Sequence, residues 1–296
     1  MIAYERIKMF HLIISEVNLK KKGRQVEIVK SVFDSADVEY ELHATATRDE
    51  VRDITAQLTA GKGNSVIVLG GDGTLHDVLN AFADFETPLG IIPLGTGNDF
   101  AESARIPADI KKAAQLIVSN PPRPIDYIQF ENGLRSLNAF GMGIDVDVLE
   151  RAYAGKSVKR SKYLRALIVS LAKFKSHNFT VRYNGVEEKH FGLIAAVGNG
   201  RQFGGGIKLF PDAKIDDGYL DLFMIDFVSK FKILGAFIKL MRGKINKVKQ
   251  VRAVRVKEVE FIPDGKNFTF QADGELYSNI PIKAKLIEGK LKFYTV

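Results

Sequence analysis

The chain has 296 residues, of which 46% are hydrophobic and 26% charged, and its formal net charge is +8. This composition is typical of a globular protein of about two domains and excludes a disordered or fibrous chain. The absence of cysteine excludes disulfides, cysteine-ligated metal sites and a thiol nucleophile. No run reaches the roughly 18 apolar residues of a spanning helix, and the N-terminus lacks a signal-peptide core, so we expect a cytoplasmic protein.

Short apolar runs alternate with helix-like segments along residues 1–125. The apolar runs predict strands at residues 9–15, 38–43, 66–69 and 89–93. Helical periodicity predicts helices at residues 22–34, 48–59, 75–85 and 109–119. Strands that alternate with helices form parallel crossover units, so we predict an α/β nucleotide-binding domain with a parallel sheet.

In residues 126–296 the pattern changes to short strands separated by turns, and we predict a β-rich sandwich or open barrel. Turn signals such as Asn132-Gly133 and Asp264-Gly265 separate the predicted strands. The strands are predicted at residues 127–130, 134–140, 179–183, 189–197, 219–223, 252–261, 268–272 and 282–294. We leave open a return of the extreme C-terminus to the first domain.

The positive charge is concentrated in two segments, which we call the basic segments. Residues 151–179 contain eight Lys and Arg and no acid, and residues 227–257 contain ten and no acid. Together they carry +18, so the rest of the chain carries −10. Both have apolar residues at helical spacing, as do helices that lie on anionic bilayers. An amphipathic helix packed on the β-rich domain explains the apolar face equally well, but it does not explain the absence of acids.

A glycine-rich turn, Gly70-Gly71-Asp72-Gly73-Thr74, follows the strand at residues 66–69 and precedes a helix that contains Leu75 and His76. Glycines allow a sharp turn and let backbone N–H groups approach a phosphate at the helix N-terminus. The turn is neither a Walker loop nor the dinucleotide fingerprint. Asp72 beside a phosphate requires a divalent cation or a role in orienting a partner. A glycine-rich turn with an Asp cap is the alternative.

A second junction follows the strand at residues 89–93, where a Gly95-Thr96-Gly97 turn leads to Asn98 and Asp99. Open α/β sheets place their ligands at the carboxyl ends of parallel strands, so phosphate or ribose contacts are expected here. Taken alone, Asn98 and Asp99 are also ordinary helix-capping residues. Two junctions of this kind in one domain favour a nucleotide site.

Together these motifs resemble the diacylglycerol kinase catalytic domain family, which includes bacterial soluble lipid kinases and sphingosine kinases and is distantly similar to NAD kinases. The resemblance rests on the sequences GGDGT, PLGTGNDFA, GMGIDVDV and QADGE, and on residues 199–221. It covers nearly the whole chain in the right order, and it implies a two-domain lipid kinase with ATP between the domains. The nucleotide contacts that it implies are Thr45, with Thr47 competing, and Gly70, Gly71, Asp72, Gly73, Thr74, Leu75, His76, Gly95, Thr96, Asn98 and Asp99.

An acidic loop contains Asp216, Asp217 and Asp221 around Gly218. Carboxylates clustered in this way suit a hard cation such as Mg²⁺, and a solvated acidic turn is the alternative. The resemblance implies a structural Mg²⁺ held by the Asp217 carboxylate and the carbonyls of Lys214 and Tyr219.

Transfer of a phosphoryl group to a hydroxyl needs a base near the acceptor. The resemblance implies that Asp273-Gly274-Glu275 is the catalytic acid/base motif, and either Asp273 or Glu275 could accept the proton. It also implies an acidic network of Asp72, Asp99 and Asp126. Lys159 is the proposed partner of that network, with Lys156 and Lys162 competing.

One part of the chain departs from the family. Members usually carry an Asn-Pro-x-Ser-Gly-like phosphate loop after the first strand, but here the strand continues into Glu16-Val17-Asn18. That departure puts one nucleotide contact in doubt. The five histidines show no metal-like spacing, so we interpret them as structural or surface residues, with His76 a candidate for the nucleotide site.

We therefore predict an ATP- and Mg²⁺-dependent kinase that phosphorylates a diacylglycerol-like lipid at the inner membrane face. Expected partners are the lipid, an anionic membrane surface and a second copy of the chain. No nucleic-acid-binding module is recognised, so no nucleic-acid partner is expected. The alternatives are a lipid-binding or regulatory protein with weak or no kinase activity, and a kinase for a soluble acceptor such as NAD.

Overall fold

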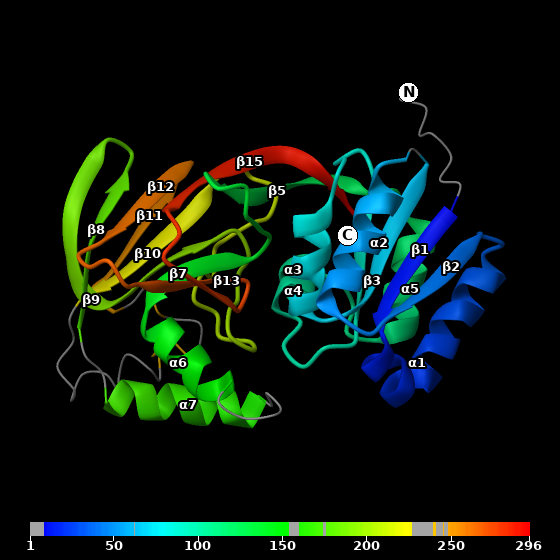
Figure 1. The fold of residues 1–296 in the computed structure, drawn as a ribbon, viewed down its shortest axis with the longest axis horizontal. Helices are drawn as coiled ribbons and strands as arrows, with labels where there is room; N and C mark the ends of the chain where they lie inside the picture. Colours follow the sequence, from blue (N-terminus) through cyan, green and yellow to red (C-terminus); the bar gives the residue numbers. More distant parts are fainter. Residues whose placement is uncertain are drawn as a thin grey trace. The chain divides into compact units, whose positions relative to one another are not determined.

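The chain divides into two compact units in a computed structural model. The first contains Met1–Ile125 and Gly289–Val296, and the second contains Asp126–Glu288 (Figure 1). The described helices include none that is both long and apolar enough to span a membrane. The structure describes residues 9–61, 63–153, 160–173, 176–226, 239–240, 245 and 248–296.

A parallel sheet forms the centre of the first unit. β1 (Met9–Ser15) lies between β2 (Tyr40–Thr45) and β3 (Asn64–Gly70), and β3 pairs with β4 (Leu89–Pro93). The last residue of β15 (Ile282–Phe293) pairs in parallel with Leu89, which adds the C-terminus to this sheet. The predicted parallel α/β fold is confirmed, and the carboxyl ends of β1–β4 share one edge.

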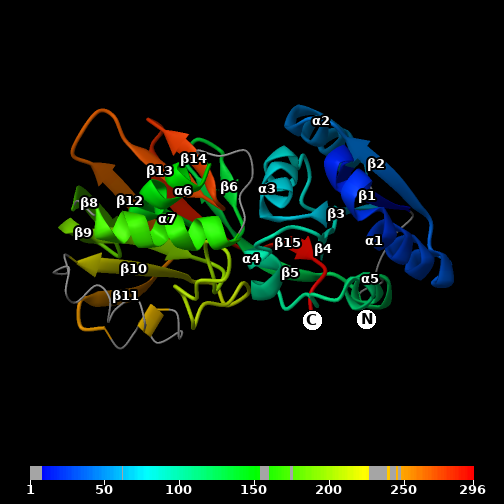
Figure 2. The same cartoon turned by 90° about the horizontal axis from the view of Figure 1, so that it is seen from below.

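Helices cover both faces of this sheet (Figure 2). α1 (Glu16–Ser35) and α5 (Ile110–Ser119) pack together on one face, and α2 (Arg48–Thr59) and α3 (Asp72–Ala81) pack together on the other. α4 (Asp99–Ser103) is a single turn that the sequence did not predict, because so short a helix has no apolar periodicity.

α1 begins at Glu16, directly after β1, and not at residue 22 as predicted. Ser15 caps it by accepting a hydrogen bond from the Asn18 N–H at 3.2 Å. Lys22 has non-helical dihedral angles (φ −122°, ψ 22°), so the helix is kinked where the predicted periodicity begins. The segment that replaces the family's phosphate loop is therefore the first turn of a helix.

Antiparallel strands build the second unit, and β9 (Val186–Gly198) is its longest. The first half of β9 pairs with β8 (His177–Tyr183), and its second half lies between β7 (Ala139–Gly143) and β10 (Leu220–Asp226). The strands that extend these pairings are β5 (Arg123–Phe130), β6 (Arg135–Ser136), β11 (Val251–Val256), β12 (Glu258–Pro263), β13 (Thr269–Ala272), β14 (Glu275–Ser278) and β15. The predicted β-rich, sandwich-like fold is confirmed.

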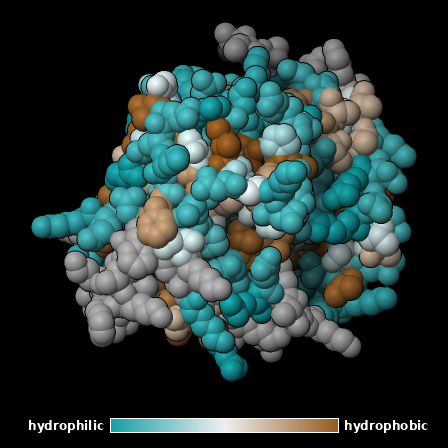
Figure 3. Space-filling view, turned by 60° about the vertical axis from the view of Figure 1, so that its left-hand side comes forward, coloured by the Kyte–Doolittle hydropathy of each residue, from teal (hydrophilic) through white to brown (hydrophobic). Residues whose placement is uncertain are grey.

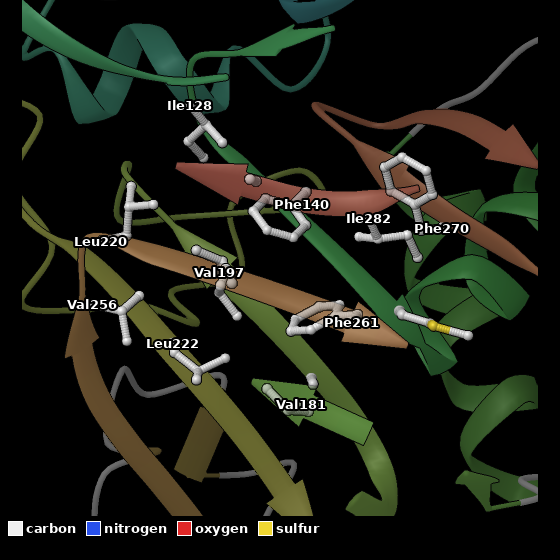
Figure 4. Close-up of a cluster of buried hydrophobic side chains, with 14 of the residues drawn as sticks. Ile128, Phe140, Val181, Val197, Leu220, Leu222, Val256, Phe261, Phe270 and Ile282 are labelled. Carbon is white, nitrogen blue, oxygen red and sulfur yellow. The ribbon is translucent and has the colours of Figure 1, made fainter. Parts of the chain in front are cut away.

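The second unit has two hydrophobic cores, one on each face of β9 and β10. Aromatic and branched side chains such as Phe140, Phe261 and Phe270 fill the first core between the strands (Figure 4). On the other face, Ile194 and Phe223 pack against α6 (Ile144–Tyr153) and α7 (Arg160–Ala172). Side chains alternate between the faces of a strand, so these strands bury both sides.

Two predicted strands of this unit are each two strands. The prediction at residues 134–140 covers β6 and the start of β7, and that at 252–261 covers β11 and β12. β11 pairs with β10 whereas β12 pairs with β8 and β15, so the chain changes partners at Lys257, and hydrophobic alternation does not reveal such a change. The predicted helix of the second basic segment lies mostly outside the described residues.

Candidate active site

The two glycine-rich loops of the first unit interlock at the carboxyl ends of β3 and β4. The N–H groups of Leu94 and Gly95 donate to the Gly70 carbonyl at 2.8 and 3.1 Å. A Cβ atom added to Gly95 would lie 2.6 Å from the Gly71 Cα, so only glycine allows this approach of the two backbones. The glycines therefore fix the position of one loop against the other.

Asp72 joins the loops in a second way. Its Oδ2 accepts from the Asp99 N–H at 3.0 Å, and its Oδ1 accepts from the Phe100 N–H at 3.1 Å. The carboxylate thus caps α4, whose own N-cap residue, Asn98, has a left-handed backbone (φ 54°) and makes no side-chain cap. The Asn98 side chain instead closes the Gly95 turn with hydrogen bonds of 3.0 and 3.1 Å.

The first turn of α3 begins after a glycine. Its N-cap residue, Gly71, has no side chain that could make a capping hydrogen bond. The first N–H groups of a helix have no intrahelical acceptor, and together with the helix dipole they favour an anion. Gly73 and Thr74 are half-buried and Thr96 is exposed, so this arrangement fits the phosphates of a nucleotide.

Three other predicted nucleotide contacts are buried. Leu75 is part of the core, and the His76 side chain is buried within α3, where the Asn80 amide donates to its carbonyl at 2.9 Å. The Thr45 hydroxyl, at the end of β2, donates to the Ile14 carbonyl at 3.2 Å. These three side chains therefore pack inside the first unit.

An ion-pair cluster that the sequence did not reveal fixes α3. Asp77 is buried, and it pairs with Arg48 at 2.6 Å and with Arg52 at 2.9 Å, both from α2. Because α3 carries the predicted phosphate-binding turn at its start, this cluster holds that turn in place. No local pattern marks the pairing, since the partners lie on separate helices.

Asp273 lies in the tight turn between β13 and β14, with φ 52°, and its carboxylate is surrounded by donors. Oδ1 accepts from the Ser136 hydroxyl at 2.6 Å and from the N–H groups of Asn138 and Ala139 at 2.9 and 3.2 Å. Oδ2 accepts from the Leu137 N–H at 3.0 Å. Four donors from one segment thus stabilise the charged carboxylate and fix the turn that precedes Glu275.

Asp145 is a buried carboxyl from the GMGIDVDV motif. Burial raises its pKa to about 7. A Cβ atom on Gly141 would lie 2.4 Å from its Oδ2, so glycine at 141 makes room for the acid. Packing thereby explains why the motif combines Gly141 with Asp145. α6 begins one residue before Asp145.

The acidic loop is tied to the start of the second unit through Asp126. Oδ2 of Asp126 accepts from the Gly218 N–H at 2.9 Å, and the Asp126 N–H donates to the Ile215 carbonyl at 2.7 Å. Asp217 accepts from the Tyr219 N–H at 3.3 Å and pairs with Arg255. Lys214 is exposed on the same loop.

The acidic loop also gathers negative charge. Burial, together with the charges of Asp217 and Asp212, raises the pKa of Asp221 to about 6. Oxygen donors and a surplus of negative charge are what a hard cation requires, so the loop fits the predicted Mg²⁺. Arg255, which also lies over the Tyr219 ring at 4.2 Å, supplies one positive charge there.

In the folded chain, acidic residues from other segments lie beside part of the basic segments. Arg252 pairs with Glu188 at 2.7 Å and Asp226 at 3.1 Å, and Lys257 pairs with Glu288 at 3.1 Å. Acids from neighbouring strands thus neutralise the end of the second basic segment. Lys159 and Lys156 lie outside the described residues, and so does the side chain of Lys162.

Comparison with known proteins gives the same family for both units. The model of the diacylglycerol kinase catalytic domain matches residues 11–130, and that of the YegS C-terminal NAD kinase beta sandwich-like domain matches residues 138–295. The chain belongs to the diacylglycerol kinase family. Family membership makes it an ATP-dependent lipid kinase.

Among curated relatives, the chain is 31% identical over 250 residues to "Diacylglycerol kinase" of Mycobacterium tuberculosis (strain CDC 1551 / Oshkosh), which covers 82% of this chain and 80% of the relative. It is 29% identical to "Probable lipid kinase YegS-like" of Yersinia enterocolitica, over 93% of this chain and 94% of the relative. The resemblance predicted from the motifs is confirmed.

Solved structures from Bacillus anthracis str. Sterne have the same fold as the chain. A diacylglycerol kinase superposes with a TM-score of 0.74 at 20% identity, and a second structure superposes with 0.81 at 23%. Each alignment covers 99% of this chain and 98% of the other. At such identities the likeness concerns the fold alone.

Proposed function

We propose that the chain transfers the terminal phosphoryl group of ATP to the free hydroxyl of a diacylglycerol-like lipid at an anionic membrane surface. The observation that carries the proposal is the pair of interlocked loops at the carboxyl ends of β3 and β4, beside the first turn of α3, whose N-cap is Gly71. Relatives described as diacylglycerol kinase and lipid kinase support a lipid acceptor over a soluble one.

In this proposal the first unit binds the nucleotide. The N–H groups of residues 71–74 and Thr96 contact the phosphates, and Asp72 and Asn98 keep the two loops in register. ATP supplies the phosphoryl group, and Mg²⁺ neutralises charge on its phosphates. The lipid oxygen forms the new P–O bond, the bond to the ADP oxygen breaks, and the hydroxyl proton passes to a carboxylate.

We assign Glu275 as the proton acceptor and Asp273 as its positioning residue. Asp273 already accepts four hydrogen bonds from residues 136–139, which stabilise its charged form and leave it poorly suited to take up a proton. Glu275 begins β14, two residues later, and is half-buried. The tight turn therefore holds Glu275 at a fixed place on the second unit.

Kinetic assays with radiolabelled ATP and diacylglycerol in mixed micelles test this assignment. Glu275→Gln is expected to lower kcat at least 100-fold while leaving the melting temperature unchanged. Asp273→Asn is expected to lower both kcat and the melting temperature. Glu258→Gln, on exposed β12, is the matched control. Wild-type turnover by Glu275→Gln would refute the assignment.

The acidic loop is the proposed Mg²⁺ site, with the Asp217 carboxylate and the carbonyls of Lys214 and Tyr219 as ligands. Its oxygen chemistry and its concentration of negative charge support the proposal. Asp217→Asn should weaken Mg²⁺ binding, measured by calorimetry on the full chain, at least tenfold. Asp264→Asn, in an exposed turn, should bind Mg²⁺ as the wild type does.

The first basic segment is the proposed membrane contact. On α7, Ile168 is 52% exposed and Arg165 is exposed, and Lys173, directly after the helix, is exposed too. On the face in Figure 3, hydrophobic residues form several groups separated by hydrophilic ones. The exposed charges of Arg165 and Lys173 are expected to hold the first basic segment to an anionic bilayer.

Flotation with phosphatidylglycerol vesicles tests the membrane contact. The double variant Arg165→Gln/Lys173→Gln should bind vesicles less than the wild type, and salt near 1 M should abolish the difference. Lys266→Gln/Lys290→Gln removes the same charge from exposed positions elsewhere and should bind as the wild type does. Equal loss in both double variants would refute a localised contact. We also expect a homodimer at the inner membrane face, to be checked by light scattering and cell fractionation.

A further inference from the structure

Three potential metal ligands meet on β1 and β2, and the functions proposed above use none of them. Nδ1 of His11 lies 3.0 Å from Nε2 of His43. Oε2 of Glu41 lies 3.6 Å from the His11 nitrogen and 3.7 Å from the His43 nitrogen. Among the described residues, these are the three side chains of the His, Cys, Asp and Glu types that bring their ligand atoms together in this way.

Strand pairing produces this cluster. In the parallel register Glu41 lies opposite His11, and His43 lies opposite Ile13. Residues 41 and 43 point to the same face because side chains alternate along a strand. No sequence pattern marks this cluster, because the two histidines are 32 residues apart in the chain.

The cluster lies on the face of the sheet that α1 does not cover. Phe10 and Tyr40 contact Phe33 of α1, so the side chains that alternate with them point to the opposite face. His11 and His43 are 8% and 16% exposed, whereas Glu41 is 59% exposed. Two fixed imidazoles and one carboxylate open to solvent would let a cation enter without unfolding the sheet.

The distances match metal coordination. The three ligand atoms form a triangle whose corners are all about 2.0 Å from a common point, close to the Zn–N and Zn–O bond lengths of about 2.0–2.2 Å. A hydrogen bond between the two imidazoles explains only the 3.0 Å contact between their nitrogens. It does not explain why the Glu41 oxygen stands almost equally far from both rings.

We propose that His11, Glu41 and His43 form a binding site for a divalent transition-metal ion, with Zn²⁺ as the cation of best fit. Imidazole nitrogens favour zinc and its neighbours over Mg²⁺, which prefers oxygen ligands only. Three protein ligands leave further positions for water. The site links the outer strand β2 to β1, so bound zinc stabilises the first unit independently of phosphoryl transfer.

Calorimetric titration of the full chain with ZnCl2, without nucleotide, tests the proposal. The wild type is expected to bind one zinc ion at this site, to melt a few degrees higher with zinc than with EDTA, and to give a visible absorption spectrum with Co²⁺. Glu41→Gln and His43→Gln should each weaken this zinc binding at least tenfold. Both should melt as the wild type does in EDTA.

Two controls separate this site from other zinc binding. Glu39→Gln removes an exposed carboxylate two residues before Glu41, and His177→Gln removes a partly exposed histidine of the second unit. Both should bind zinc as the wild type does. The proposal is overturned if the wild type takes up no zinc, or if Glu41→Gln and His43→Gln bind it as tightly as the wild type. Glu41 is exposed, so its variant keeps the test valid even if His43→Gln fails to fold.

Discussion

The interlocked loops of the first unit and the acidic motifs of the second are built in opposite ways. In the first unit, glycine backbones at 70–71 and 95 meet directly, and the elements involved are neighbours in the chain. In the second unit, buried or half-buried carboxylates accept backbone hydrogen bonds across long stretches of chain, as Asp273 does from residues 136–139.

The difference separates two uses of glycine and aspartate. Glycine in the first unit leaves out side-chain atoms, so that the backbones of the two loops can approach closely. Aspartate in the second unit satisfies N–H groups and so holds loops and turns in position. If this distinction is right, glycine substitutions should act by steric overlap, and aspartate substitutions by unpaired donors or changed ionisation.

The largest effect is expected for Asp145→Asn, which should change how the stability of the folded chain depends on pH. The pKa of Asp145 is raised to about 7 in the folded state by burial, from an ordinary 3.8 in the unfolded chain. Between these values the folded chain binds more protons, so wild-type stability should fall as pH rises from about 4 to 7, by up to about 4 kcal/mol. The amide cannot ionise, so the variant should be more stable than the wild type at pH 8. Thermal melts across pH 4–8 check this, and parallel profiles would contradict it.

Asp273→Asn is expected to have the second largest effect on stability. The amide offers one accepting oxygen, so at least one of the N–H donors from residues 137–139 would face an NH₂ group. A loss of about 3 kcal/mol in the free energy of unfolding is expected, measured by urea denaturation. Asp264→Asn, in an exposed turn, should change it by less than about 0.5 kcal/mol. Equal stability of the two variants would mean that the hydrogen bonds do not fix the turn.

Gly95→Ala tests the steric half of the comparison. The added methyl group would lie 2.6 Å from both the Gly71 Cα and the Asn98 Oδ1, so the loops must separate. A loss of about 2 kcal/mol and a weaker affinity for ATP are expected. Gly265→Ala, with no atom within 4 Å of its new methyl group, is the control. ATP titrations in which both variants match the wild type would show that the loop contact is dispensable.

Asp72 belongs to the first unit but acts as the acids of the second do, and it gives the smallest effect. Asp72→Ala should cost about 1 kcal/mol, because two N–H groups of α4 lose their acceptor. Asp72→Asn keeps one of the two hydrogen bonds, because its amide offers one accepting oxygen, and should cost less than Asp72→Ala. If Asp72→Asn keeps its stability but loses kcat, the charge of Asp72 serves the nucleotide. If the kcat values of both variants fall only as far as their stability does, Asp72 is only a cap.

The sequence predicted the sites unequally well. The loops at 70–74 and 95–99 were found because each lies within one strand–turn–helix unit, whose glycines and polar residues are adjacent in the chain. The roles within them were harder to assign. Asp72, expected beside a phosphate, caps α4, and His76, a candidate for the nucleotide site, is buried within its helix. Only contacts between elements separate a capping acid from a ligand.

Pairings between distant residues were missed altogether. The donors around Asp273, the Arg48 and Arg52 partners of Asp77 and the His11–Glu41–His43 cluster all join separate elements. The absence of acids from the basic segments likewise gave no sign that Glu188 and Asp226 would neutralise Arg252. Charge along a sequence is a poor guide to charge in space when strands bring other segments alongside.

By itself, the sequence determined the parallel α/β unit, the β-rich unit, the family and the positions of the two glycine-rich turns, because all of these depend on local periodicity and on glycines at fixed spacing. The tertiary structure alone decided which carboxylates are held by donors, which basic residues are neutralised and which histidines meet. Those outcomes depend on strand register and helix packing, in which residues far apart in the chain come within hydrogen-bond distance.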